Sequence, residues 1–217
     1  MKKYKCIIFD MDGTVTQTNQ LIFESFNHIA EKYIKKRLTP EEIIELFGPP
    51  EEECIETMVG SEHIEPAVDE YYRYYRSEHQ RLASLYPGMK EILEYLKRKN
   101  IRLALFTGKG RRTTDISLEE CRITEYFDTT LTGDDVDEFK PSGDGIWKIM
   151  QKFSLQSADV LMVGDSVSDF KASRETGVDI ASVVWDSYGR EEVLKLASDY
   201  HFHNVTEFFN WLKTIYH

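Results

Sequence analysis

The sequence predicts an α/β protein, with a Rossmann-like parallel sheet at its core and an inserted all-helical domain. Three observations predict this fold. Short, continuous apolar runs recur along the chain, as expected for strands that are covered on both faces. Helical patterns separate these runs. The stretch from 17 to 86 shows helical periodicity and contains no strand-like run.

The predicted strands are four apolar runs. They are CIIF (6–9), LALF (103–106), VLMV (160–163) and IASVVW (180–185). Each run is continuous rather than alternating, which favours a parallel sheet with helices on both of its faces. The strands and the helical patterns between them therefore form a βαβ succession.

Between the strands, apolar residues recur at the i, i+3, i+4, i+7 spacing of an amphipathic helix. One set is Met89, Ile92, Leu93 and Leu96, and a second is Ile146, Ile149, Met150 and Phe153. The last helix carries Val205, Phe208, Phe209, Leu212 and Ile215, with Asn204 or Thr206 as its N-cap. We expect each helix to pack its apolar face on the sheet.

The inserted segment has its own helical stripe, formed by Ile22, Phe26, Ile29 and Tyr33. FGPPEE (47–52) is a turn followed by a new helix, with Pro50 or Glu51 in the first turn. The insertion ends where Tyr86, Pro87 and Gly88 stop one helix and open the next. We therefore predict a discontinuous sheet domain, residues 1–16 and 87–217, with a helical cap at 17–86.

Composition excludes several classes of function. Hydrophobic residues make up 41% of the chain and charged residues 30%, and no apolar run is long enough to cross a membrane. The formal net charge of -11 disfavours nucleic-acid and membrane partners, which need a basic surface. The three cysteines lie far apart, which is typical of reduced thiols. We expect a cytoplasmic protein.

Carboxylates follow two of the predicted strands. Asp10 and Asp12 come after the first run, and VGDSVSD (163–169) places Asp165 and Asp169 four residues apart where a strand gives way to a helix. Ligands bind beyond the carboxyl ends of parallel strands, so we expect these acids to converge. Four converging carboxylates need a counter-ion, and Mg²⁺ prefers oxygen ligands of this kind.

These motifs resemble those of the haloacid dehalogenase superfamily of phosphatases, in the phosphoglycolate phosphatase-like and β-phosphoglucomutase-like branch with a helical cap. The four motifs stand in order as FDMDGT (9–14), FTGKG (106–110), KPSGDG (140–145) and VGDSVSD (163–169). Any single motif is weak evidence, but four in order at matching strand ends are strong. The resemblance covers essentially the whole chain, and the insertion has the position and length of the family's cap.

The resemblance implies catalytic roles. Asp10 would attack phosphorus to form an aspartyl-phosphate, and Asp12 would protonate the leaving oxygen and later deprotonate water. Thr107 would donate a hydrogen bond to the phosphoryl group, and Lys140 would neutralise charge. Mg²⁺ would be held by Asp10, the backbone carbonyl of Asp12, Asp165 and Asp169.

Other residues are candidates for binding phosphate or substrate. Gly13 lets the chain turn tightly beside the phosphate, and Gly108 follows the threonine of the second motif. Gly48 resembles the substrate loop of the cap, although GPP is also an ordinary helix break. Arg111 is a candidate substrate contact, and its alternative interpretation is a solvated start of a helix.

The leading hypothesis is a Mg²⁺-dependent phosphatase of a small phosphorylated metabolite, such as phosphoglycolate or a sugar phosphate. The alternative is a phosphosugar mutase, which the core motifs do not exclude. A third class is a regulatory protein with a phosphorylatable aspartate, which an insertion that roofs the site argues against. A true dehalogenase and a phosphonatase are disfavoured because Asp12 is present. The sequence does not show which cap residues select the substrate. It does not show the oligomeric state either.

Two further patterns favour ordinary structural roles. On a helix, the consecutive tyrosines and arginines of 71–76 point in different directions, so some would be buried in the cap and others would cover its surface. Stacking on nucleic acid is disfavoured, also because the chain carries a net negative charge. His201 and His203 would share one face if their segment formed an additional edge strand, and two histidines without a third ligand rarely form a metal site.

Overall fold

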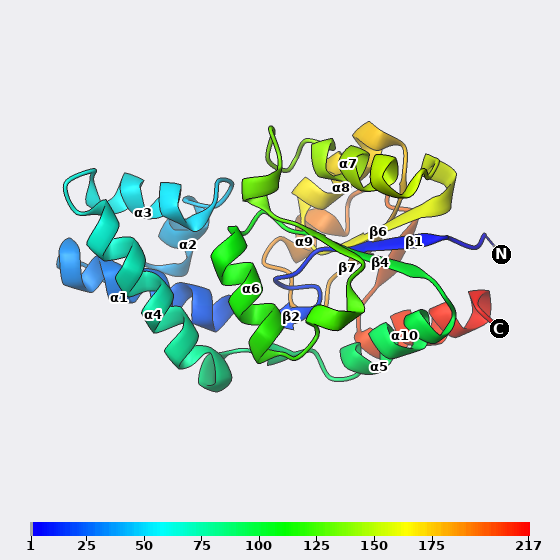
Figure 1. Ribbon diagram of the computed structural model, residues 1–217, viewed down its shortest axis with the longest axis horizontal. Helices are drawn as coiled ribbons and strands as arrows, with labels where there is room; N and C mark the ends of the chain where they lie inside the picture. Colours follow the sequence, from blue (N-terminus) through cyan, green and yellow to red (C-terminus); the bar gives the residue numbers. More distant parts are fainter. Residues whose placement is uncertain (1) are drawn as a thin grey trace.

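A six-stranded parallel sheet forms the centre of the larger part of the protein, shown in Figure 1. The computed structural model describes residues 2–217. The strand order is β5-β4-β1-β6-β7-β8, and every neighbouring pair is parallel. The strands are β1 (Cys6–Phe9), β4 (Arg102–Phe106), β5 (Thr129–Leu131), β6 (Val160–Gly164), β7 (Asp179–Val183) and β8 (Tyr200–Phe202).

The central strands are continuous apolar runs because both of their faces are covered. In β1, Ile7 and Phe9 belong to one buried cluster, whereas Cys6 and Ile8 belong to a second cluster on the opposite face. Strands β4 and β6 alternate between the two clusters in the same way. The four predicted strands are confirmed, although β7 ends at Val183, before the last two residues of the predicted run.

Helices cover both faces of the sheet, with α5 and α10 below it and α7 and α8 above it in Figure 1. Their bounds are α5 (Met89–Arg98), α6 (Arg111–Glu120), α7 (Asp144–Phe153), α8 (Val167–Thr176), α9 (Arg190–Val193) and α10 (Val205–Ile215). The predicted apolar stripes are the buried faces of α5, α7 and α10. Asn204 is the N-cap of α10, since its side chain accepts a hydrogen bond from the Glu207 amide. Short 3₁₀ turns occur at Thr124–Tyr126, Gly133–Asp135 and Ser157–Asp159.

The inserted segment consists of helices α1 (Asn19–Tyr33), α2 (Pro40–Ile44), α3 (Glu51–Val59) and α4 (Ile64–Leu82), at the left of Figure 1. It has its own buried cluster, in which the predicted stripe residues Ile22, Phe26 and Ile29 meet Tyr71 and other side chains of α4. The tyrosines of α4 are therefore divided between the buried core of the insertion and its surface, as predicted. Tyr71, Tyr72 and Tyr75 are buried, and Tyr74 stacks on His28.

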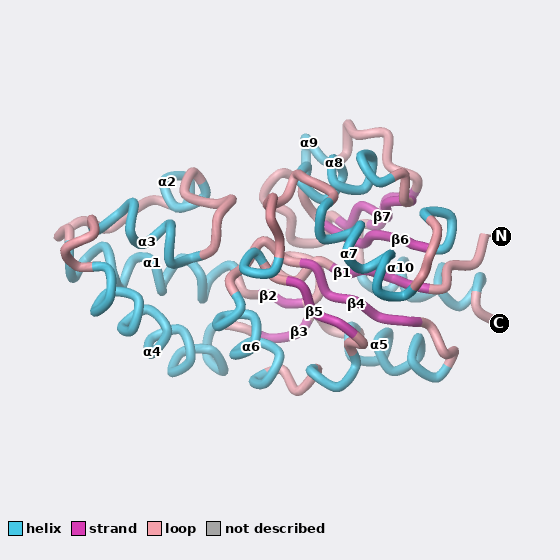
Figure 2. The backbone as a smooth tube through the Cα atoms, turned by 45° about the horizontal axis from the view of Figure 1, so that its top comes forward, coloured by secondary structure: helices cyan, strands magenta, loops and turns pink. Residues whose placement is uncertain are grey.

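Two very short strands, which the sequence did not predict, join the insertion to the sheet. Strands β2 (Thr16–Gln17) and β3 (Ser84–Leu85) lie side by side in Figure 2 and form an antiparallel pair. In this pair Thr16 faces Leu85 and Gln17 faces Ser84. A pair of two-residue strands carries no apolar run, so periodicity does not reveal it. The pair lies close to the predicted domain boundaries, which themselves stay a prediction.

None of the helices in residues 2–217 combines the length and the apolar character needed to cross a membrane. The cysteines of this part of the chain, Cys6, Cys54 and Cys121, are free thiols. Cys6 lies in β1 and Cys54 in α3, and both side chains are buried.

Candidate active site

The carboxyl ends of β1, β4 and β6 bring the predicted motifs together at one edge of the sheet. Asp10 follows β1, Thr107 follows β4 and Asp165 follows β6. Because β1 lies between β4 and β6 in the sheet, Asp10 stands in the middle of this group. Parallel strands end at the same edge, which explains how residues far apart in sequence meet here.

Three buried carboxylates form a cluster at this edge. One oxygen atom from each of Asp10, Asp165 and Asp169 lies within 4.8 Å of the others. Asp169 is fixed in the first turn of α8 by a capping box, in which Ser166 Oγ donates a hydrogen bond of 2.7 Å to its carboxylate. As the acid in the first turn of α8, Asp169 also interacts favourably with the N-terminus of the helix.

Lys140 binds two of these acids. Its Nζ atom is 2.8 Å from Asp10 Oδ1, 2.7 Å from Asp169 Oδ1 and 2.7 Å from the carbonyl oxygen of Phe106. These three acceptors use all three N–H groups of the ammonium. Burial alone would lower the pKa of Lys140, but the carboxylates of Asp10 and Asp169 outweigh burial and raise it.

The cluster carries more negative charge than one ammonium can balance. Burial raises the pKa of the Asp10 carboxyl, against the opposing effect of Lys140. Burial also raises the pKa of Asp165, and the charges of Asp10 and Asp169 add to the rise. The donors are hard carboxylate oxygens, which Mg²⁺ prefers. The residues present therefore fit a divalent cation of this type.

Gly13 makes room for Asp165. Its φ angle is +80°, and a Cβ atom placed there would stand 2.4 Å from Asp165 Oδ2. The backbone conformation and the close approach both require glycine at this position. Thr14, the next residue, donates a hydrogen bond of 3.3 Å to Asp165 Oδ1.

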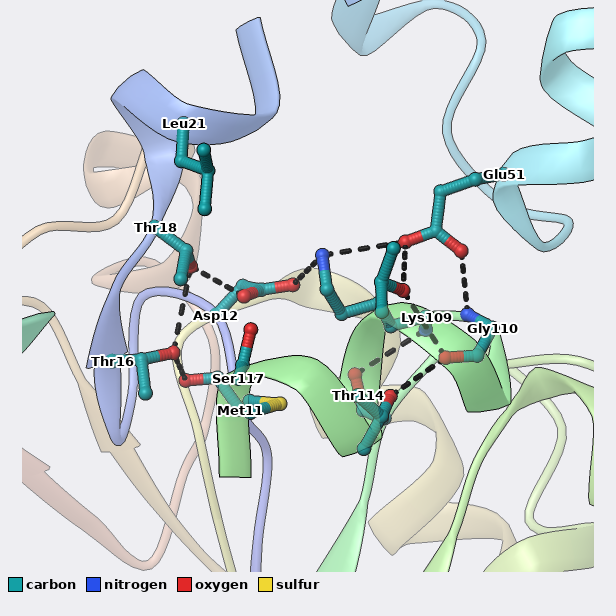
Figure 3. A network of polar contacts seen from close by, with 12 residues as sticks. Met11, Asp12, Thr16, Thr18, Leu21, Glu51, Lys109, Gly110, Thr114 and Ser117 are labelled. Atoms are coloured by element: carbon teal, nitrogen blue, oxygen red, sulfur yellow. Dashed lines mark hydrogen bonds and ion pairs between the residues drawn. The ribbon is translucent and has the colours of Figure 1, made fainter. Parts of the chain in front are cut away.

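A second polar network, shown in Figure 3, surrounds Asp12. Thr18 Oγ1 donates a hydrogen bond to Asp12 Oδ1, and Lys109 Nζ lies 3.2 Å from Asp12 Oδ2. The same ammonium lies 3.3 Å from Glu51 Oε1, in the first turn of α3. Burial alone would lower the pKa of Lys109, but Asp12, Tyr75 and Glu51 outweigh it and raise the pKa.

Glu51 also binds the start of α6 directly. Its Oε2 atom accepts a hydrogen bond of 2.7 Å from the Gly110 amide, and its Oε1 atom accepts one of 2.6 Å from Thr113 Oγ1. Glu51 and Lys109 are thus two buried site residues that sequence reasoning missed. The lysine of FTGKG was a visible signal, but nothing in the run EEE (51–53) shows which glutamate turns inward.

A cavity of about 390 Å³ lies between the strand ends and the helical insertion. Seven of the predicted site residues line it, namely Asp10, Asp12, Gly48, Thr107, Gly108, Lys140 and Asp165. Asp169 and Gly13 adjoin lining residues, since Asp169 accepts a hydrogen bond from Lys140 and Gly13 closely approaches Asp165.

The structure does not bring Arg111 to the cavity. Its guanidinium donates a hydrogen bond of 3.0 Å to the carbonyl oxygen of Thr130 and forms an ion pair with Asp135. These partners at the end of β5 hold the side chain away from the strand ends of β1 and β6. The neighbouring Arg112 stacks over the ring of Tyr72, with its guanidinium carbon 4.1 Å from the ring centroid.

The comparison with protein families decides the classification. A family model described as haloacid dehalogenase-like hydrolase matches residues 7–183. The chain belongs to this family. The match runs from β1 to the end of β7 and includes the helical insertion between them.

Several known proteins resemble this haloacid dehalogenase-like hydrolase along nearly its full length. A pyrophosphatase PpaX from Anoxybacillus flavithermus is 30% identical over 194 residues, which are 89% of this chain and 90% of the relative. The crystal structure of a predicted phosphoglycolate phosphatase from Haemophilus somnus has a TM-score of 0.79 at 22% identity, with 99% of each chain covered. A Thermotoga maritima protein, provisionally assigned as a β-phosphoglucomutase, has a TM-score of 0.75 at 27% identity over 97% of this chain and 99% of that one.

These comparisons confirm the predicted family and fold. The family match and the relative that is 30% identical also confirm that this haloacid dehalogenase-like hydrolase is a phosphatase.

Proposed function

We propose that this phosphatase hydrolyses a phosphomonoester of a small metabolite through an aspartyl-phosphate on Asp10. The supporting observation is the pairing of Asp10 with Lys140 at 2.8 Å, at the floor of a cavity that Asp12 also lines. One carboxylate is thereby held as a nucleophile, while a second stands two residues away for proton transfer.

In the first step the Asp10 carboxylate attacks phosphorus, and the bond from phosphorus to the ester oxygen breaks. Asp12 gives its proton to the departing oxygen, which leaves as a neutral alcohol. In the second step Asp12 takes a proton from a water molecule. The hydroxide attacks phosphorus, inorganic phosphate is released and the Asp10 carboxylate is restored.

The other residues bind and orient the phosphoryl group. Lys140 offsets negative charge beside Asp10, and Thr107 donates a hydrogen bond to a phosphoryl oxygen. Asp10, the backbone carbonyl of Asp12, Asp165 and Asp169 would hold Mg²⁺, which when bound offsets the charge of the phosphoryl group and the carboxylates. Gly108, Gly48 and the backbone around Gly13 adjoin the substrate. The insertion at 17–86 acts as a cap over the site.

The proposal includes a reducing, cytoplasmic location, which the free thiols of Cys6, Cys54 and Cys121 support. No nucleic-acid or membrane partner is proposed. The formal net charge of -11 supports a small-molecule substrate instead.

The test is phosphate release from phenyl phosphate, with Mg²⁺ and with a chelator. Wild-type protein should need Mg²⁺, and Asp10→Asn should lose at least about a thousandfold in kcat, since the nucleophile is removed. Full activity of Asp10→Asn would contradict the nucleophile assignment. Acid-quenched protein incubated with ³²P-labelled substrate should carry label only when Asp10 is present.

A further inference from the structure

The cavity has two chemically different halves, and the inference drawn from them rests on the proposed function. Its floor carries the polar residues of the strand ends. Its roof is apolar and is built mainly by the helical insertion, from Ile22, Phe26, Ile44, Phe47 and Pro49, with Tyr188 from the loop after β7. The volume of about 390 Å³ is sufficient for a small organic molecule.

The roof presents aromatic rings to the cavity. Phe26 and Phe47 lie with ring centroids 6.5 Å apart, and Tyr188 packs on Phe23 at 5.4 Å. Cys54 also lines the cavity, but its thiol donates a hydrogen bond of 3.1 Å to the Leu46 carbonyl oxygen within the insertion. This half of the cavity therefore offers contact area rather than charge.

Among the described residues that line the cavity, the cations are Lys109 and Lys140. Lys140 has three acceptors within 2.8 Å, and Lys109 lies between Asp12 and Glu51 with its ammonium 4.8 Å from the Tyr75 ring centroid. Both ammonium groups are already paired with carboxylates of the protein. Neither is free to serve as counter-ion for a second anionic group of a substrate.

A second anion in the roof would meet an unfavourable environment. It would lose its hydration among apolar side chains without gaining a cation. Glu51, which also lines the cavity, would add like-charge repulsion, which its pairing with Lys109 reduces without supplying a new cation. A phosphoglycolate carboxylate, a second phosphate of a sugar bisphosphate, or the second phosphate of pyrophosphate would each be placed in this situation.

We propose that the substrate is a phosphomonoester whose only anionic group is the reacting phosphate and whose alcohol part is uncharged and largely apolar. Neutral polar groups are accommodated at the margin, where Asn19 and Ser168 line the cavity. Of the substrates expected from the sequence, phosphoglycolate is disfavoured because of its carboxylate, and a sugar phosphate fits only if its sugar part is largely apolar. It also disfavours the mutase alternative, because a bisphosphate intermediate carries a second phosphate.

The decisive experiment compares two substrates that differ in one charge. Phenyl phosphate and 4-carboxyphenyl phosphate have the same ring and the same ester bond, and only the second carries an additional carboxylate. With Mg²⁺, kcat/KM for phenyl phosphate should exceed that for 4-carboxyphenyl phosphate by at least about tenfold, the size of effect expected for an unpaired buried charge. Benzyl phosphate and phosphoglycolate provide a second pair with an alkyl oxygen, and pyrophosphate is measured beside them.

A variant tests the cause of the preference. Phe47 is 44% exposed, so the rim position accepts a long charged side chain. Phe47→Arg should lower the ratio of kcat/KM for the two aryl substrates by about tenfold, because the guanidinium gives the carboxylate a partner. Phe47→Met is the matched control, since it keeps an apolar side chain, and should retain the wild-type ratio.

Several outcomes would overturn the inference while leaving the phosphatase assignment intact. They are equal or faster Asp10-dependent hydrolysis of 4-carboxyphenyl phosphate, of phosphoglycolate or of pyrophosphate, and an unchanged ratio in Phe47→Arg. Failure of the proposed function itself has a different signature. In that case all substrates would remain intact, or all would be hydrolysed equally by wild type and Asp10→Asn.

Discussion

The carboxylate of Glu51, in the first turn of α3, lies 3.3 Å from the ammonium of Lys109, which follows β4. This buried ion pair connects the helical insertion to the sheet. The ammonium also lies 3.2 Å from Asp12, so one cation links a residue of the insertion with the proposed acid/base.

Removing Glu51 should destabilise the protein. Glu51→Ala leaves the Gly110 amide and the Thr113 hydroxyl without their acceptor and Lys109 with one carboxylate fewer. We expect a loss of about 2–4 kcal/mol in the free energy of unfolding, measured by urea denaturation. Glu53→Ala, an exposed neighbour in the same run, is the control and should change stability by less than about 0.5 kcal/mol. Equal losses in the two variants would contradict a specific role for Glu51.

Weakening the acidic cluster should raise the requirement for Mg²⁺. Asp165→Asn keeps the size of the side chain and removes one of three converging charges. The Mg²⁺ concentration that gives half-maximal phosphate release should rise at least about tenfold. Asp137→Asn alters an acid that is 89% exposed and paired with Lys148, and it should leave the Mg²⁺ curve unchanged. A superimposable curve for Asp165→Asn would show that this carboxylate is not a ligand.

Substitution of Gly13 should damage activity more than an equivalent substitution elsewhere. Gly13→Ala forces Asp165 to move, because the new Cβ atom meets its carboxylate at 2.4 Å. Gly60→Ala is the matched control, since Gly60 has a φ of +78° and nothing within 4 Å of its Cβ position. Both substitutions place a side chain on a backbone with positive φ, and this strain should cost about 1–3 kcal/mol of stability.

Only Gly13→Ala should lose phosphate release. Comparable activity in the two variants would indicate that the approach of Gly13 to Asp165 has no part in catalysis. Urea denaturation of both proteins separates a general loss of folded protein from the local effect.

Stability should fall below neutral pH because of His79. This side chain of α4 is 1% exposed, its Nε2 lies 3.1 Å from Ser117 Oγ, and burial lowers its pKa, against the opposing charge of Glu120. Below a pH of about 6.5 the unfolded chain binds a proton that the folded protein resists, so folding becomes less favourable as the pH decreases. Above that pH the contribution is complete.

The measurement is Tm at about pH 7.5 and about pH 5.5, for wild type, His79→Gln and His63→Gln. One titrating group changes the free energy of unfolding by at most about 1.4 kcal/mol per pH unit. His79→Gln should show a smaller decrease than wild type, and His63→Gln, at an exposed position, should follow wild type. Parallel curves for wild type and His79→Gln would remove His79 as the cause.

The sequence predicted the parts of the fold that two-sided burial determines. β1, β4 and β6 are apolar throughout because each contacts a cluster on both faces. β5 was missed, since TTL at the edge of the sheet contains little apolar sequence and only part of it is buried. The same reason hides β2 and β3, whose two residues each provide no periodicity.

The meeting of Asp10 and Asp165 was predictable because both follow parallel strands, and strand ends share an edge. The pair formed by Glu51 and Lys109 was not, since it depends on how α3 packs against the start of α6. The orientation of Arg111 was also unpredictable, because Asp135, which draws its guanidinium away, is 24 residues distant and belongs to a turn after β5.

The pairing of β2 with β3 has a consequence for how such proteins diversify. Gln17 and Ser84 stand opposite each other, so the chain enters and leaves the insertion through neighbouring residues. An insertion of different length can begin and end at this junction without altering the strands that lead to Asp10 and Asp165, provided that it replaces Glu51 as a partner of Lys109. Selectivity for the alcohol and the chemistry of phosphorus are then free to evolve separately.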